Sequence, residues 1–153
     1  MVEDPKSLLF GLYDALELAF GQTHWWPAET PFEVCIGAIL TQNAPWSSVV
    51  KAIAALRGEG LFDSASIAGA DEKKLARLIR PSIYHNQKAR YLKTFCGFLE
   101  ERYGGVIENM GELALNDARS LLLSLPGIGF ETADSILLYA LRKPIFVVDA
   151  YTM

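Results

Sequence analysis

A glycine turn followed by an aspartate is the part of this sequence with the clearest chemical potential. Gly127 and Gly129 stand two residues apart behind Pro126, and because glycine adopts either sign of φ at no steric cost, the segment predicts a tight turn. Apolar residues on one face then predict a helix over 130–141. The N–H groups of its first turn and the helix dipole favour an anion. The turn therefore predicts a grip on the phosphates of a nucleic-acid backbone, and an ordinary helix corner is the alternative.

The segment from the turn to the aspartate, LPGIGFETADSILLYALRKPIFVVDAYT, resembles the helix–hairpin–helix and aspartate signature of the endonuclease III superfamily of DNA glycosylases. The resemblance extends upstream to Ile39–Ile53 and Ile79–Gly105, in the family's order. Trp25-Trp26-Pro27 and the glutamate after the turn are most similar to the branch that removes 3-methyladenine. The resemblance implies that the partner is double-stranded DNA containing a damaged base.

Two acidic residues would then decide the reaction. Cleavage of a sugar–base bond builds positive charge on the deoxyribose, and a nearby carboxylate stabilises that charge and orients or deprotonates the attacking water. The resemblance gives this catalytic role to Asp149, for which a plain helix N-cap is the alternative. Bifunctional relatives carry a lysine at the position of Glu131, and a glutamate cannot form a Schiff base. The sequence therefore predicts a monofunctional hydrolase. Glu131 would face the base, and the alternative is a first-turn glutamate that the helix dipole stabilises.

Aromatic residues predict a pocket for an extruded base. Trp25, Trp26 and Trp46 are all the tryptophans of the chain, and stacking of a base on such a ring contributes about 1–3 kcal/mol. A positively charged alkylated purine adds a cation–π attraction. Filling of the core is the alternative for each indole.

A polar pair, Gln42 and Asn43, lies between two predicted helices. In the family the matching residue fills the gap left by the flipped nucleotide, so Gln42 is expected to wedge the duplex, and capping by Asn43 is the alternative. The resemblance implies DNA contacts by Gln42, Asn43, Leu125, Pro126, Gly127, Ile128, Gly129, Phe130 and Thr132. It also implies a monovalent cation at the carbonyls of Leu125 and Ile128. No cofactor is required, and no iron–sulfur cluster is expected from Cys35 and Cys96, which are predicted to be reduced core residues.

The composition indicates a folded domain of 153 residues, 51% hydrophobic and 21% charged. The apolar runs are too short to span a bilayer, and the basic start of a secretion signal is absent, so a cytoplasmic location away from membranes is expected. The net charge of −4 is unusual for a protein that binds DNA through a broad basic surface. Basic residues group at 73–80 and 88–93, where most are interpreted as solvated helix faces.

The elements that must position these residues are helical almost throughout. Periodicity and caps predict helices at 5–20, 32–41, 45–58, 65–68, 72–79, 86–103, 117–125 and 130–141. The fold class is therefore all-α, and the resemblance implies a glycosylase-type six-helix barrel over 25–148, with the helix–hairpin–helix at 118–141. Residues 1–24 are expected to supply the N-terminal helix of a second, split domain. Residues 149–153 are expected to begin a C-terminal segment whose remainder is missing.

The function expected from these patterns is that of a DNA N-glycosylase of base excision repair, acting on alkylated purines such as 3-methyladenine. One alternative is a mismatch or oxidised-base glycosylase of the endonuclease III type. Another is a non-catalytic helix–hairpin–helix fragment that binds DNA, because the shortened chain could be inactive. The oligomeric state stays open.

Overall fold

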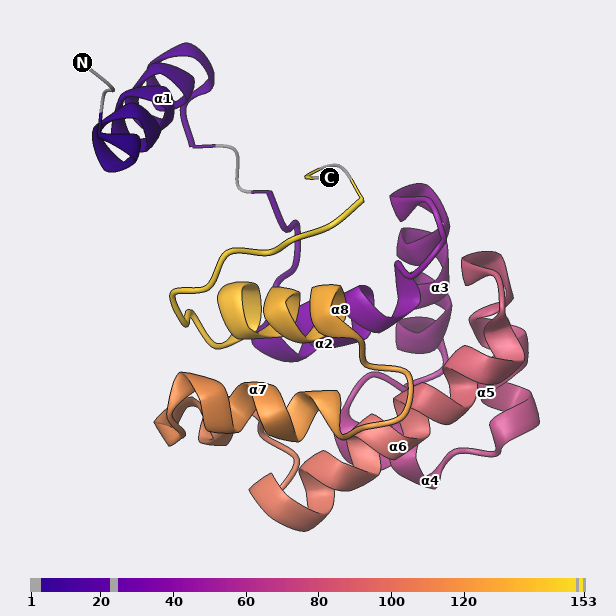
Figure 1. Cartoon of the computed structure of the whole chain (residues 1–153). Coiled ribbons are helices and arrows are strands. Elements are labelled where there is room, and N and C mark those ends of the chain that lie inside the picture. Colours follow the sequence, from indigo (N-terminus) through magenta and orange to yellow (C-terminus); the bar gives the residue numbers. More distant parts are fainter. Residues whose placement is uncertain (1–3, 23–24, 151, 153) are drawn as a thin grey trace.

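The computed structural model describes residues 4–22, 25–150 and 152, and within these ranges the chain forms helices and no strand (Figure 1). The helices are α1 (Pro5–Phe20), α2 (Pro31–Leu40), α3 (Trp46–Gly58), α4 (Ser64–Gly69), α5 (Glu72–Leu78), η1 (Arg80–Ser82), α6 (His85–Tyr103), η2 (Ile107–Glu112), α7 (Leu115–Leu123), α8 (Phe130–Ser135) and η3 (Ile136–Ala140). The all-α fold class is confirmed. The two short 3₁₀ segments, η1 and η2, lack the apolar periodicity that predicted the other helices.

Side-chain caps explain where several helices begin. Thr30 Oγ1 accepts a hydrogen bond from Glu33 N at 3.1 Å and starts α2. Asp63 starts α4 with a capping box, in which its carboxylate accepts from Ser66 N at 2.8 Å. Asp71 accepts from Lys74 N at 2.7 Å and starts α5. These caps satisfy N–H groups that a helix leaves without an internal partner.

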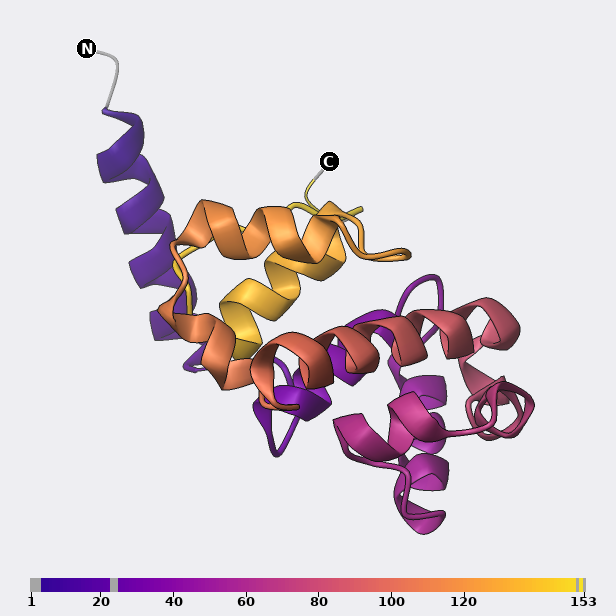
Figure 2. The same ribbon diagram turned by 90° about the horizontal axis from the view of Figure 1, so that it is seen from below.

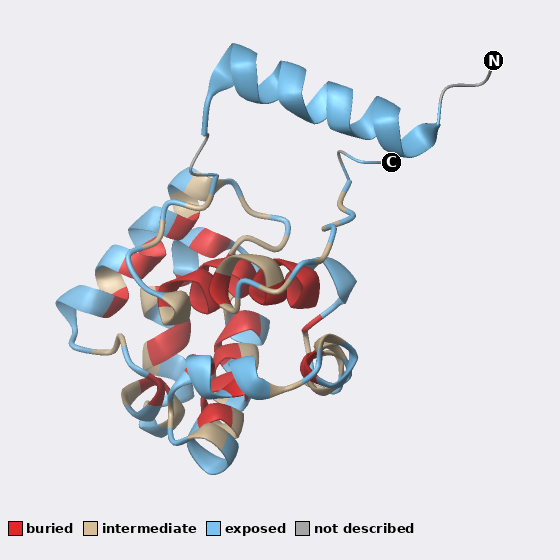
Figure 3. Ribbon diagram, turned by 90° about the vertical axis from the view of Figure 1, so that its left-hand side faces the viewer, coloured by how far each residue is buried: buried red, intermediate tan, exposed pale blue. Residues whose placement is uncertain are grey.

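The core is built around α2, which is buried from Glu33 to Leu40. This helix packs against α3, α6, α8 and η3, and the buried positions concentrate in these central helices (Figure 3). On α6 the inward-facing residues Ala89, Leu92, Cys96 and Leu99 are all buried, and Tyr103 is half-buried. Cys35 and Cys96 are free and buried, as predicted. The apolar all-round character of α2 is what places it at the centre.

Helix α1 stands apart from this core (Figures 1 and 2). None of its residues is buried, and the apolar side chains of Leu8, Leu12, Leu16 and Phe20 are exposed. No helix of the described part of the chain combines the length and hydropathy needed to cross a bilayer.

Helices α7 and α8 form the helix–hairpin–helix unit. A bidentate ion pair joins them, with Arg119 Nε 2.7 Å from Asp134 Oδ1 and Nη2 2.9 Å from Oδ2. Asp134 is almost fully buried, and its hydrogen bonds raise the pKa of Arg119. The helix predicted over 130–141 continues from α8 into η3 without a break, but its last turn is π-helical rather than α-helical. A π-turn of this kind is common beside functional sites.

Candidate functional site

The two glycines of the turn differ in what they contribute. Gly127 has a φ of +82°, and a Cβ there would overlap the ring of Tyr91 on α6. Gly129 has a φ of −90° and a ψ of −177°, a conformation open to any residue, and a Cβ there would meet nothing within 4 Å. The sequence predicted conformational freedom at both positions, and only Gly127 uses it. The missing side chain of Gly129 instead leaves open space at the start of α8.

Gln42, which is distant from this turn in the sequence, holds the turn by hydrogen bonds. Its Nε2 donates to the carbonyl of Gly127 at 2.7 Å and to Thr132 Oγ1 at 3.0 Å. The amide of Gln42, which the sequence predicts as the wedge, is engaged with the turn in this structure. The neighbouring Asn43 is exposed and has a φ of +53°. The loop tip is therefore Asn43.

A cleft of about 1100 Å³ lies between the turn, the loop after α2 and the chain after η3. Of the residues singled out in the sequence, it is lined by Trp25, Trp26, Gln42, Asn43, Gly127, Ile128, Gly129, Phe130, Glu131, Thr132 and Asp149. Leu125, Pro126 and Trp46 are not among its lining residues. The carbonyl of Leu125 accepts a hydrogen bond from Ile128 N at 3.2 Å, which leaves it a second lone pair.

The tryptophans have three different environments. Trp25 is 72% exposed at the cleft. Trp26 is half-buried, with its ring centroid 5.2 Å from that of Tyr139 and 5.7 Å from that of Trp46, edge to face. Trp46 lies behind Trp26, and both indoles fit because Gly37 has no side chain. Trp46, which the sequence predicts as a pocket residue, contacts Trp26 edge to face and is not among the lining residues of the cleft.

Two buried polar atoms of cleft-lining residues have no hydrogen-bond partner in the described structure: Trp26 Nε1 and Thr41 Oγ1. A buried polar group left unsatisfied costs about 1–3 kcal/mol, and such groups in folded proteins normally have a partner, either protein or water. Both atoms have almost no accessible surface, and Trp26 Nε1 lies against α2, 3.4 Å from where a Cβ of Gly37 would stand.

Asp149 enters the cleft from the irregular chain after η3. Its Oδ1 accepts from Thr152 N at 3.0 Å and from Thr152 Oγ1 at 2.8 Å. This is the geometry of a helix-capping aspartate, so the capping arrangement and the position in the cleft occur together. Burial, and then the negative charge of Asp149, raise the pKa of Tyr139. The carboxylate is thus close enough to influence the ring beside Trp26.

Several cleft residues escaped the sequence reasoning. Tyr139 shares a helix face with Thr132 and Ser135 at spacings of seven and four, a signal that could have found it. Lys88 carried no such signal. It is only 2% exposed, and its Nζ donates to the carbonyls of Leu40, at 2.8 Å, and Ser82. Desolvation lowers the pKa of Lys88 to about 8.

Comparison with known proteins agrees with this arrangement. Residues 36–153 match the family model of the HhH-GPD superfamily of base excision DNA repair proteins. The chain belongs to this superfamily. Over 99% of its length it is 46% identical to a Methanocaldococcus jannaschii protein named "Putative DNA repair glycosylase MJ1434", of which it covers 70%. It is 31% identical over 79% of its length to endonuclease III of Thermotoga maritima, of which it spans 53%.

Solved structures of the superfamily share the fold. The crystal structure of the 3-methyladenine DNA glycosylase MagIII of H. pylori, bound to 1,N6-ethenoadenine, has a TM-score of 0.79 and 34% identity. The match covers 95% of this chain and 68% of that one. A non-covalent endonuclease III–DNA complex has a TM-score of 0.78 and covers 97% and 66% of the two chains. At 24% identity, the second match shows the fold alone. The HhH-type glycosylase fold predicted from the sequence is therefore confirmed.

Proposed function

We propose that this protein is a DNA glycosylase that hydrolyses the N-glycosidic bond of a damaged base, with Asp149 as the catalytic carboxylate. The observation that carries the proposal is that Asp149 lines the same cleft as Gly127 and Gly129. A phosphate at the start of α8 would bring the deoxyribose of the same nucleotide into this cleft. There the carboxylate stabilises the positive charge that develops on the sugar and orients or deprotonates the water.

The phosphate grip is supported by the open space at Gly129 and by the first-turn N–H groups of α8. We assign the wedge to Asn43, because it is exposed at the loop tip while Gln42 holds the turn. A monovalent cation at the carbonyls of Leu125 and Ile128 stays a prediction. The free lone pair of Leu125 fits such an ion, which would neutralise part of the phosphate charge when bound.

For the substrate we propose an alkylated purine. Trp26 and Tyr139 offer aromatic surface as a tilted pair of rings, and exposed Trp25 offers a further ring at the cleft. Electron-rich rings suit a base that carries positive charge. Thr41 lines the cleft, and its unpartnered hydroxyl is proposed to hydrogen-bond to the edge of the base. The similarity to MagIII, a 3-methyladenine DNA glycosylase, supports this substrate class.

Glu131 lines the cleft. The resemblance implies that bifunctional relatives carry a lysine at this position. Because a carboxylate forms no Schiff base, the reaction ends at an intact abasic site. Borohydride added during turnover is expected to trap no protein–DNA adduct. A trapped adduct would instead favour the endonuclease III type of reaction.

The test is release of 3-methyladenine from methylated DNA by the wild type and by Asp149→Asn. Asparagine caps a helix about as well as aspartate, so this substitution removes the charge and keeps the cap. We expect release to fall by about 100-fold or more, with an unchanged melting temperature. Equal release by both proteins would refute the role of Asp149. Tight DNA binding without release by the wild type would favour the non-catalytic alternative.

A further inference from the structure

Six of the fourteen lysine and arginine side chains already have an ion-pair or hydrogen-bond partner among the described residues. Carboxylates neutralise three of them: Arg57 pairs with Glu29 and Glu33, Lys74 with Glu59, and Arg119 with Asp134. Three lysines bury their amines on backbone carbonyls: Lys88, Lys93 and Lys143. The basic group at 88–93 is therefore mostly structural, because two of its three cations point at carbonyls.

The basic group at 73–80 is different. Lys73, Arg77 and Arg80 are exposed, and no ion pair within the described ranges includes them. Spacings of four and three residues place them on one face of α5 and its continuation η1. Lys74, which pairs with Glu59, lies about 100° around the helix from Lys73. We call Lys73, Arg77, Arg80 and Lys51 the basic stripe.

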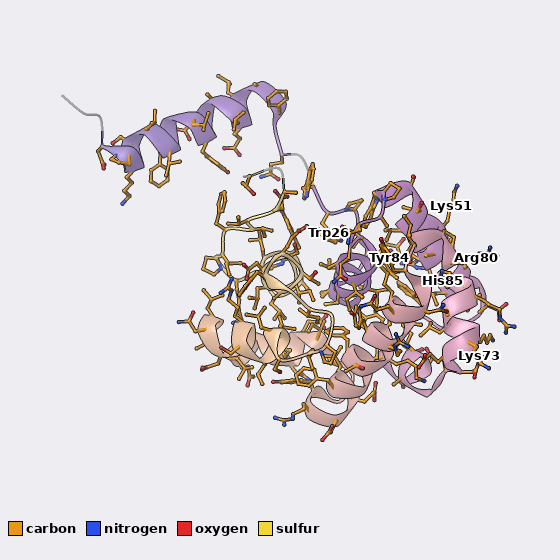
Figure 4. All side chains as sticks on the ribbon, turned by 45° about the vertical axis from the view of Figure 1, so that its right-hand side comes forward. Trp26, Lys51, Lys73, Arg80, Tyr84 and His85 are labelled. Atoms are coloured by element: carbon orange, nitrogen blue, oxygen red, sulfur yellow. The ribbon has the colours of Figure 1, made fainter. Side chains whose placement is uncertain are left out.

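Lys51 joins the stripe from α3, which packs against both α5 and η1. It too is exposed and forms no ion pair within the described ranges. Figure 4 shows Lys51, Arg80 and Lys73 along the same side of the molecule, with His85 among them. Four cations thus gather on one side of a chain whose net charge is −4.

Acidic neighbours do not cancel this charge. Asp71 is engaged as the cap of α5 through Lys74 N, and Glu59 is held by Lys74. Glu72 lies about 100° around the helix from Lys73, as Lys74 does on the other side. The stripe therefore keeps a local positive potential.

The stripe ends at the rim of the cleft. Arg80 begins η1, and the next residues after that helix are Ile83 and Tyr84, both exposed and both with positive φ. Tyr84 lines the cleft, and Figure 4 shows it between Trp26 and the stripe. From Lys73 to Arg80 a helix rises about 10 Å, which corresponds to about three base pairs of duplex.

We propose that the basic stripe binds the phosphate backbone of duplex DNA flanking the damaged nucleotide. This inference rests on the proposed function, because it needs DNA in the cleft. It also accounts for DNA binding by an acidic chain: the affinity comes from a local stripe beside the glycine turn rather than from the net charge. Contacts of this kind position the duplex without reading its sequence.

The experiment measures how affinity depends on salt. A labelled duplex with a stable abasic-site analogue is titrated by fluorescence anisotropy between about 50 and 200 mM KCl. The plot of log K against log salt has a negative slope, and each lost phosphate contact reduces the magnitude of that slope by about 0.9. The double variant Lys73→Gln, Arg80→Gln is therefore expected to have a slope smaller in magnitude by about 2.

The matched control is Lys6→Gln, Arg102→Gln, which removes the same charge from α1 and from the far end of α6. We expect its slope to equal that of the wild type. An equal change in both double variants, or no change in the stripe variant, overturns the proposal; the second result would point to an acidic protein partner instead. Single-turnover base release at saturating protein should be the same in the control variant as in the wild type. If the stripe variant and the wild type differ in slope but the wild type releases no base, the proposed function alone is refuted.

Discussion

The two glycines of the turn allow one prediction to be worked out in detail. Alanine at position 127 must adopt a φ near +82°, which costs an L-residue about 1–2 kcal/mol. Its Cβ would also overlap the ring of Tyr91, and such overpacking costs about 1–3 kcal/mol. The smaller entropy of the unfolded alanine chain returns about 0.4–1 kcal/mol to stability. Gly127→Ala should therefore lower the free energy of unfolding by about 2–4 kcal/mol.

Gly129→Ala is the control, since its backbone is extended and the space around its Cβ is open. Its free energy of unfolding should lie within about 1 kcal/mol of the wild-type value. Because that space is where a phosphate would approach α8, the same variant should bind DNA more weakly. Substitution of Gly127 is thus expected to affect stability, and substitution of Gly129 to affect DNA binding.

The assay is urea unfolding of four proteins: wild type, Gly127→Ala, Tyr91→Ala and the double variant. If the ring causes the overlap, the double variant recovers about 1–3 kcal/mol relative to the sum of the single changes. The remaining cost is that of the positive φ. A Gly127→Ala variant less than about 1 kcal/mol below the wild type, or a cycle with no coupling to Tyr91, would refute this reasoning.

Three further predictions concern the residues around the cleft. Gln42→Leu should lower the free energy of unfolding by about 1–3 kcal/mol in urea denaturation, because the Gly127 carbonyl and Thr132 lose their donor. Burial lowers the pKa of Lys88 to about 8, so the folded protein loses this proton before the unfolded chain, and stability rises with pH between about 8 and 10. Lys88→Met should remove about 2–3 kcal/mol of that rise. The measurement is the difference in free energy of unfolding between variant and wild type at each pH, and a difference that stays constant between about pH 8 and 10 contradicts the prediction. Burial raises the pKa of the Cys35 and Cys96 thiols, which acts in the opposite direction, but it does so equally in both proteins. Thr41→Val should leave the melting temperature nearly unchanged and weaken binding of free 3-methyladenine, measured by calorimetry; equal binding would show that the hydroxyl faces no base.

Local patterns in the chain were enough to predict the α-helices and the order of turn and aspartate. Apolar periodicity and N-cap residues act over one or two turns of helix, so they can be read without knowing the packing. The predicted helix after the turn, the inward face of α6 and the buried cysteines all follow from such short-range signals. The family resemblance added the fold, because the order of its motifs is specific.

Side-chain partners distant in sequence were decided by packing alone. Gln42 meets Gly127 across 85 positions, Trp26 and not Trp46 reaches the cleft, and the amine of Lys88 meets carbonyls of two separate helices. The same holds for the two basic groups: two of the three cations at 88–93 donate to backbone carbonyls, whereas the group at 73–80 mostly faces solvent. A sequence pattern shows which face of a helix a residue occupies, and only the neighbouring helices determine what that face meets.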